Sequence, residues 1–71
     1  MTLRIEIEKE KDGRWIAEVV DIPGLNGPAV YGETPDEAFN KAAAAAREVI
    51  ADRVAHNELS PEVMPLTFVA A

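Results

Sequence analysis

The side chains best suited to nucleophilic catalysis are the only serine, Ser60, and the only histidine, His56, which lie four residues apart. No third group that would orient the histidine accompanies them, and no glycine-rich turn that would hold an oxyanion is present. Cysteine is absent, which excludes a thiol nucleophile, disulfides and cysteine-ligated zinc. His56 instead fits a solvated helix end, where a cation favours the negative end of the helix dipole. We therefore expect no catalytic pair here.

Carboxylates are the other groups that could do chemistry, because two that converge can bind Mg²⁺ or act as acid and base. They lie on or near two apparent strands and on one apparent helix, at Glu6, Glu8, Glu18, Asp21, Asp36, Glu37, Glu48 and Asp52. Strand alternation sends Glu6 and Glu8 to the face opposite their apolar neighbours, which indicates solvated surface charge. Gly24, Gly27 and Gly32 match neither a dinucleotide-binding nor a P-loop pattern. We expect no enzyme, no metal and no cofactor.

The element predicted most clearly is one long helix within residues 30–54. Thr34 can cap its start, Pro35 suits the first helical position, and Glu37 completes a T-x-x-E capping box after Gly32. An apolar stripe then recurs at three- and four-residue steps, at Phe39, Ala42, Ala43, Ala46, Val49, Ile50 and Val54. Because alanine dominates this stripe, the helix axis can lie close to a sheet.

Four extended segments surround this helix in the order β-β-β-α-β. In residues 3–8 apolar and charged residues alternate, and the Asp12-Gly13 dipeptide favours a hairpin turn into residues 14–20. Residues 21–28 form a loop whose apolar anchors are Ile22 and Leu25, and 29–31 make a short strand. Residues 66–69 make the last strand, with Leu66 and Phe68 on one face. This pattern predicts one α+β domain, 1–71, with a small antiparallel or mixed sheet and one helix on one face.

Size and charge narrow the function. With 71 residues the chain buries only a small core, so its stability alone is marginal. Because disulfides and cysteine-ligated zinc are excluded, we expect oligomerisation to stabilise it. Its net charge of −6 suits a phosphate backbone poorly, so we expect no direct nucleic-acid binding. The charge would attract a basic protein, or it serves solubility alone. We find neither a signal peptide nor a membrane-spanning segment, so we expect a cytoplasmic protein without membrane contact.

The second strand is apolar on both faces, which one covering helix does not require. Trp15, Ala17 and Val19 form one face, and Ile16 and Val20 flank a glutamate on the other. We interpret the second face and the following loop as a partner or oligomer surface, comprising Ile16, Glu18, Val20, Asp21, Pro23, Gly24 and Leu25. Scattered exposed apolar residues, which are common on monomers, are the alternative interpretation.

Taken together, the hairpin, the loop and the capped helix resemble the HicB-like antitoxin domain. The resemblance covers nearly the whole chain and is carried by the runs DGRWIAEVVDIPGL and YGETPDEAFNKA, at Asp12, Gly13, Trp15, Ala17, Glu18, Asp21, Pro23, Gly24, Gly32, Thr34, Glu37 and Ala38. It implies a partial ribonuclease H fold and an antitoxin that masks a HicA-like toxin, a small basic mRNA-cleaving ribonuclease with a catalytic histidine. Masking such a toxin suits a protein of charge −6.

The chain also departs from the HicB-like pattern. Many relatives continue into a DNA-binding domain, whereas this chain ends at Ala71, so we expect no operator binding by this chain. The segment LNGPAVY between Gly24 and Gly32 is longer than in many relatives. The acid cluster of ribonuclease H is not recognisable on the first strand, so the resemblance implies no nuclease activity. The alternative function is a stand-alone homo-oligomeric domain without a toxin, associating through Ile16 and Val20.

Overall fold

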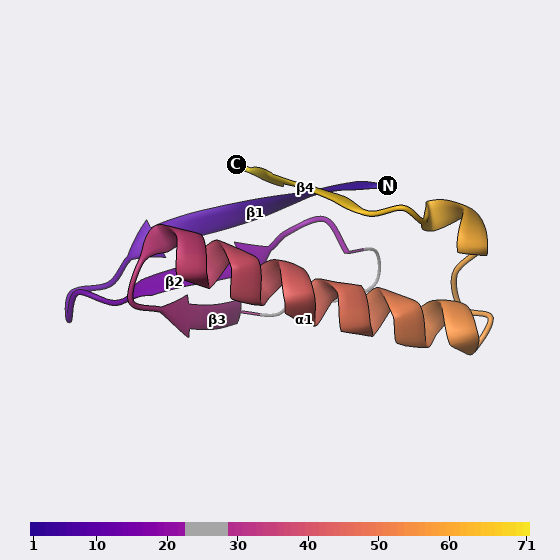
Figure 1. Ribbon diagram of the computed structural model, residues 1–71, viewed down its shortest axis with the longest axis horizontal. Helices are drawn as coiled ribbons and strands as arrows, with labels where there is room; N and C mark the ends of the chain where they lie inside the picture. The colour runs from indigo at the N-terminus through magenta and orange to yellow at the C-terminus, as the bar shows by residue number, and fades with distance from the viewer. Residues whose placement is uncertain (23–28) are drawn as a thin grey trace.

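A computed structural model describes residues 1–22 and 29–71, and in this part of the chain one helix crosses one face of a four-stranded mixed sheet (Figure 1). The elements follow in the order β1 Thr2–Lys9, β2 Trp15–Val19, β3 Ala29–Gly32, α1 Pro35–Ala55, η1 Pro61–Val63 and β4 Thr67–Ala70. The predicted α+β class and the order β-β-β-α-β are confirmed. The 3₁₀ helix η1 lies between α1 and β4.

The sheet has the strand order β3-β2-β1-β4. β2 pairs antiparallel with both β1 and β3, whereas β4 runs parallel to β1. β2 is one residue shorter at each end than the predicted segment 14–20, and β4 begins and ends one residue later than the predicted 66–69. The sheet is therefore mixed, and its two edges are the short strands β3 and β4.

The hairpin between β1 and β2 turns at Asp12 and Gly13, as predicted. Gly13 has φ +91°, a conformation that glycine adopts without a Cβ penalty. The Glu10 N–H donates to the Arg14 carbonyl at 2.7 Å, and an Asp12 carboxylate oxygen accepts from the Arg14 N–H at 3.0 Å. This turn sets the register of the hairpin, in which Ile5 lies opposite Val19.

The core lies between α1 and the face of the sheet that this helix covers. Its buried members are Leu3, Ile5, Ala17, Val19, Ile22, Ala38, Ala42, Ala43, Ala46 and Ile50. The predicted anchor Ile22 is thus confirmed, whereas Leu25 lies outside the described residues. Phe39 and Val54 are partly buried and pack against this core, and Val49 is also only partly buried. Ala38, which we did not place on the stripe, is fully buried.

Ala38 is buried because the end of β3 lies very close to the first turn of α1. A Cβ added at Gly32 would lie 2.5 Å from the Ala38 backbone nitrogen, far inside contact distance. Gly32 therefore lets the end of β3 touch the first turn of the helix. The glycine that precedes the predicted helix cap is required by packing.

Both ends of α1 carry hydrogen-bonded caps. The Thr34 hydroxyl accepts from the Glu37 N–H at 3.0 Å, and the Glu37 carboxylate accepts from the Glu33 N–H at 3.3 Å, one residue earlier than an ideal capping box. At the other end Asn57 has φ +61°. Its N–H donates to the Val54 carbonyl at 3.1 Å, and the Glu58 N–H donates to the Arg53 carbonyl at 2.8 Å. These bonds form a Schellman motif, which the sequence analysis missed.

After the helix, the chain returns through η1 to place β4 beside β1, so that the two ends of the chain lie close to the same edge of the sheet (Figure 1). The Thr67 N–H donates to the Met1 carbonyl at 2.9 Å, and the Ala71 N–H donates to the Ile5 carbonyl at 2.8 Å. Leu66 and Phe68 are partly buried and pack against the core, as predicted. The Arg47 guanidinium lies 4.9 Å from the centre of the Phe68 ring and connects α1 to this edge.

Candidate interaction surface

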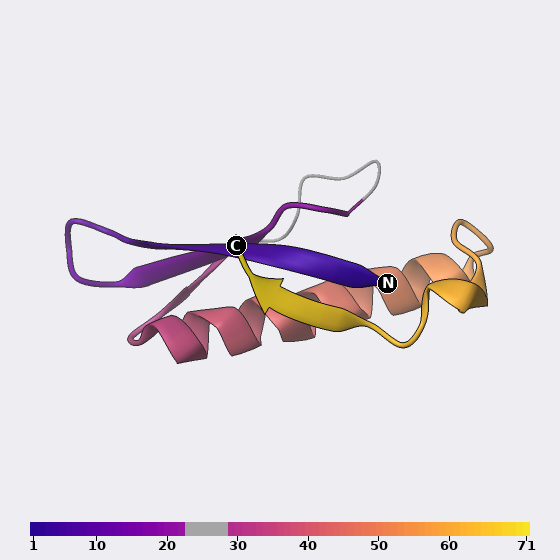
Figure 2. The same ribbon diagram turned by 90° about the horizontal axis from the view of Figure 1, so that it is seen from above.

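The face of the sheet opposite α1, which we name the open face, gathers the side chains with the greatest capacity to bind a partner. Figure 2 shows α1 on one side of the sheet, and no other described helix covers the second side. Side chains alternate between the two faces along each strand. The open face therefore carries Thr2, Arg4, Glu6 and Glu8 from β1, Ile16 and Glu18 from β2, Ala29 and Tyr31 from β3, and Thr67 and Val69 from β4.

Two glutamates lie directly opposite each other at the centre of this face. The register pairs Glu6 of β1 with Glu18 of β2, and Glu8 follows two residues further along β1. All three are exposed, and in the described part of the chain none takes part in an ion pair. Like charges directly opposite on neighbouring strands destabilise a sheet. The open face thus holds an acidic pair whose described cationic neighbour, Arg4, forms its ion pair with Asp21 and acts on Glu6 only through its charge.

Apolar side chains border these glutamates. Ile16 lies opposite Glu8 on one side and Tyr31 on the other, and both Ile16 and Val20 are only partly buried. Tyr31 is 43% exposed and Val69 is 41% exposed, which is high for large apolar residues. The surface is therefore mixed, with an acidic centre between apolar side chains, as in the interfaces of many protein complexes.

An ion pair between Arg4 and Asp21 lies at the border of the open face, just after the end of β2. The Arg4 Nε and NH2 groups donate to the two carboxylate oxygens of Asp21 at 2.9 and 3.0 Å, and the Arg4 backbone N–H donates to the same carboxylate at 3.1 Å. These hydrogen bonds from Arg4 lower the pKa of Asp21. Asp21, which we predicted in the partner surface, therefore holds the exit of β2 against β1.

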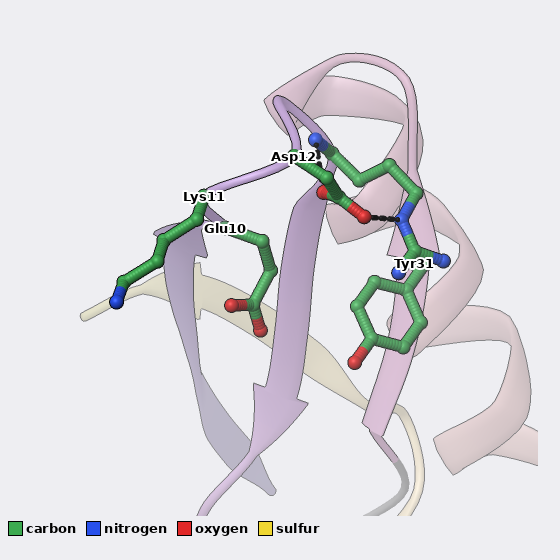
Figure 3. A pocket seen from close by; sticks show the side chains of 5 residues that line it. Glu10, Lys11, Asp12 and Tyr31 are labelled. Carbon is green, nitrogen blue, oxygen red and sulfur yellow. Dashed lines mark hydrogen bonds and ion pairs between the residues drawn. The ribbon is translucent and has the colours of Figure 1, made fainter.

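A shallow hollow of about 320 Å³ opens beside the hairpin turn and is lined by Glu10, Lys11, Asp12, Arg14 and Tyr31 (Figure 3). The Arg14 Nε lies 2.7 Å from an Asp12 oxygen, and the guanidinium carbon lies 4.2 Å from the centre of the Tyr31 ring. Hydrogen bonds from Arg14 lower the pKa of Asp12. Lys11 points away from Tyr31 in Figure 3. Since none of these charged side chains is buried, the hollow lacks the buried polar group that would orient a small ligand.

Ser60 and His56 have structural partners. The His56 Nδ1 lies 2.8 Å from the Asp52 carbonyl oxygen, and this hydrogen bond raises the pKa of His56. The Ser60 hydroxyl accepts from the Glu62 N–H at 3.2 Å and caps η1. Within residues 1–22 and 29–71, no group of three or more His, Asp or Glu side chains could hold a metal ion. In the same residues, no helix is both long and apolar enough to cross a membrane.

The structure brings three of the predicted surface residues together. Ile16 and Glu18 belong to the open face, and Val20 directly follows β2, where its N–H donates to the Arg4 carbonyl at 3.1 Å. The remaining predicted surface residues, Pro23, Gly24 and Leu25, lie outside the described residues. The sequence analysis missed Tyr31 and Val69 as members of this surface. Alternation along β3 and β4 could have placed them on one face, but only the strand order shows that this face is the one carrying Glu18.

Comparisons of this chain with protein-family models, with curated proteins and with solved structures found no match. The resemblance to the HicB-like domain therefore rests only on the sequence runs quoted above.

Proposed function

We propose that this chain is a non-enzymatic, antitoxin-like protein that masks a basic HicA-like mRNA-cleaving toxin in a type II toxin–antitoxin system. The observation that supports this proposal is the acidic pair Glu6 and Glu18 at the centre of the open face. The HicB-like sequence pattern supplies the identity of the partner, and the face supplies a surface of complementary charge.

A basic partner changes the energetics of the open face. In the free chain Glu6 and Glu18 repel each other across β1 and β2. A lysine or arginine placed between them gains attraction to both carboxylates and cancels their mutual repulsion. The net charge of −6 also steers a basic protein towards the chain, so the association rate should fall as salt rises.

The apolar side chains of the same face give such a complex its stability. Ile16 and Val20 flank Glu18, and Tyr31 extends the surface to the edge of the sheet. Tyrosine is enriched among the residues that contribute most to binding energy, because it buries a large area at a low entropy cost. An arginine-rich partner surface would therefore pair with the glutamates and pack on the part of Tyr31 that Arg14 leaves exposed.

The second candidate is a homo-oligomer without a toxin, joined through Ile16 and Val20. It is favoured by the partial exposure of both side chains on one face. Packing two open faces together would, however, bring Glu6, Glu8 and Glu18 close to the same residues of another copy. Self-association through this face should therefore strengthen in high salt or in acid, whereas binding of a basic toxin should weaken. The direction of the salt effect distinguishes the two candidates.

Co-expression tests the proposal directly. The partner to use is the product of an adjacent reading frame that encodes a short basic protein with a central histidine. We expect this chain to rescue growth against the active toxin and to bind a toxin whose histidine is replaced. Absence of such a reading frame, together with no rescue against any HicA-like toxin, would contradict the proposal.

A charge variant assigns the binding to the open face. Glu18→Gln should weaken toxin affinity about tenfold, because it removes one charge from the proposed contact. Glu48→Gln is the matched control, since it removes one exposed charge from α1 on the other side of the sheet. Calorimetric titration of both variants measures the difference. Equal affinities would show that the open face is not the toxin site.

A further inference from the structure

The outer edge of β4 presents backbone groups that could pair with another strand. β4 ends the sheet and has β1 as its neighbour on one side. The N–H groups of Thr67 and Ala71 donate to β1. Successive residues of a strand direct their N–H and C=O groups to opposite sides, so those of Phe68 and Ala70 point away from the sheet. This edge offers two donors and two acceptors.

β4 is only four residues long, but it lacks the charged residues and prolines that usually protect an edge strand. Its sequence TFVA contains no lysine, no other charge and no proline, and Val69 is exposed. Monomeric sheet proteins normally place charges, prolines or bulges on such edges, because an unprotected edge is a template for pairing.

The opposite edge, β3, is different. Arg14 stacks on Tyr31 beside this edge and forms an ion pair with Asp12. The end of β3 at Gly32 is in contact with the backbone of α1 at Ala38. Arg14 and the start of the helix therefore border β3. The residues of β4 are themselves uncharged, and the cation beside them, Arg47 of α1, lies over the Phe68 ring.

We propose that β4 pairs with β4 of a second copy of this chain, antiparallel, in the register that places Phe68 opposite Ala70 of the second copy. The outward N–H and C=O groups of these residues then form four hydrogen bonds across a two-fold axis. The same register places Val69 opposite Val69 of the second copy, in a non-hydrogen-bonded pair, where side chains approach most closely. Pairing the backbone thus buries the exposed Val69.

The absence of charge on β4 favours a second copy of this chain as the partner for this edge. Two open faces repel each other through their glutamates, whereas two β4 strands carry no charge and are self-complementary. The two-fold axis through Val69 runs perpendicular to the sheet, so both α1 helices lie on one side and both open faces on the other. A small domain also gains the additional buried surface that its size requires. This dimer does not depend on the proposed toxin.

Hydrogen exchange of the unmodified chain is the first test. In the dimer the amides of Phe68 and Ala70 are hydrogen-bonded, so their exchange should slow as the protein concentration rises from micromolar to millimolar. The outward amides of Ala29 and Tyr31 on β3 are the internal control and should not respond. Equal, concentration-independent exchange at both edges would overturn the proposal.

Cysteine cross-linking tests the register. The chain has no cysteine, and a non-hydrogen-bonded cross-strand pair has a Cα separation of about 4.5 Å, within the range of disulfides. Val69→Cys should therefore form a disulfide-linked dimer under mild oxidation. Tyr31→Cys is the matched control, because Tyr31 is similarly exposed on the open face but lies on the other edge. Cross-linking of Tyr31→Cys as fast as that of Val69→Cys would overturn the proposal.

Proline variants test the backbone pairing. Ala70→Pro removes one outward N–H from β4, and Ala29→Pro removes the equivalent N–H from β3. Circular dichroism checks that each variant folds. Sedimentation equilibrium should give twice the 7.7 kDa chain mass for the unmodified protein and Ala29→Pro, and a mass near 7.7 kDa for Ala70→Pro. A dimer that survives Ala70→Pro, or a chain that stays monomeric at millimolar concentration, would contradict the β4 pairing.

Discussion

The two faces of the sheet are formed by the same strands but differ in the side chains that they carry. The buried residues of the face under α1 are all apolar, and Gly32 lets β3 approach the helix backbone at Ala38. The open face carries Glu6 opposite Glu18 between apolar neighbours. The covered face therefore supplies stability, and the open face keeps charges that lower stability. Under the proposed function, these charges serve the binding of a basic partner.

Truncation of one isoleucine on each side of the sheet should give the largest contrast. Ile50 on α1 is fully buried, so Ile50→Ala should lower the free energy of unfolding by about 2–5 kcal/mol. Ile16→Ala on the open face should cost clearly less, because Ile16 is already partly exposed. Urea denaturation measures both. Equal losses would show that the open face is as tightly packed as the core.

The contact between β3 and α1 should give the next largest effect. Gly32→Ala places a methyl group against the Ala38 backbone and should cost about 1–3 kcal/mol of stability. Gly13→Asn is the comparison, because a Cβ at Gly13 meets nothing within 4 Å and its cost comes from the positive φ alone, which asparagine tolerates better than most residues. Thermal unfolding compares the two variants. A Gly32→Ala protein as stable as the parent would remove close packing as the reason for this glycine.

Removing a charge from the open face should raise the free energy of unfolding, in contrast to the two preceding changes. Glu18→Gln relieves the repulsion from Glu6 and should raise the free energy of unfolding by about 0.2–1 kcal/mol. Glu48→Gln on α1 should raise stability less, because its like-charged neighbour is Asp52 one helical turn away, and such exposed pairs cost only about 0.2–0.5 kcal/mol. Denaturation at low salt measures the gain. A loss of stability in Glu18→Gln would mean that this carboxylate has a stabilising partner.

Acid should weaken the pair at the end of β2. The pKa of Asp21 is lowered below 3.8 in the folded chain by Arg4, so the pair stabilises above that pH. This contribution is lost as the pH falls through the folded pKa. Asp21→Asn should therefore flatten, but not abolish, the decline in stability below pH 4, because Asp12 and Glu37 also have lowered pKa values. An identical pH profile for Asp21→Asn would contradict a role for the pair.

Local signals in the sequence predicted the elements well. Thr34, Pro35 and Glu37 mark the start of α1 through backbone hydrogen bonding within one turn, and Asp12 with Gly13 marks the hairpin. Such signals act between residues close in sequence, so they can be recognised without knowledge of the fold. The Schellman motif is also local, yet we missed it because asparagine at position 57 takes the role that glycine usually has.

The open face was predicted only in part, for a different reason. Alternation identified Ile16, Glu18 and Val20 as one face of β2. Their neighbours depend on register and strand order, which join segments far apart in the chain. The pairing of Glu6 with Glu18 and the parallel pairing of β4 with β1 therefore became visible only in the folded structure. The candidate surface is a product of tertiary arrangement.

The most direct test of the contrast between the two faces combines stability and affinity in one variant. Glu6→Gln with Glu18→Gln removes the acidic pair and leaves the covered face unchanged. We predict that the free energy of unfolding rises while affinity for the basic HicA-like toxin falls at least tenfold, which corresponds to about 1.4 kcal/mol. Toxin affinity that stays at the parental level in this more stable protein would contradict the assignment of the open face to partner binding.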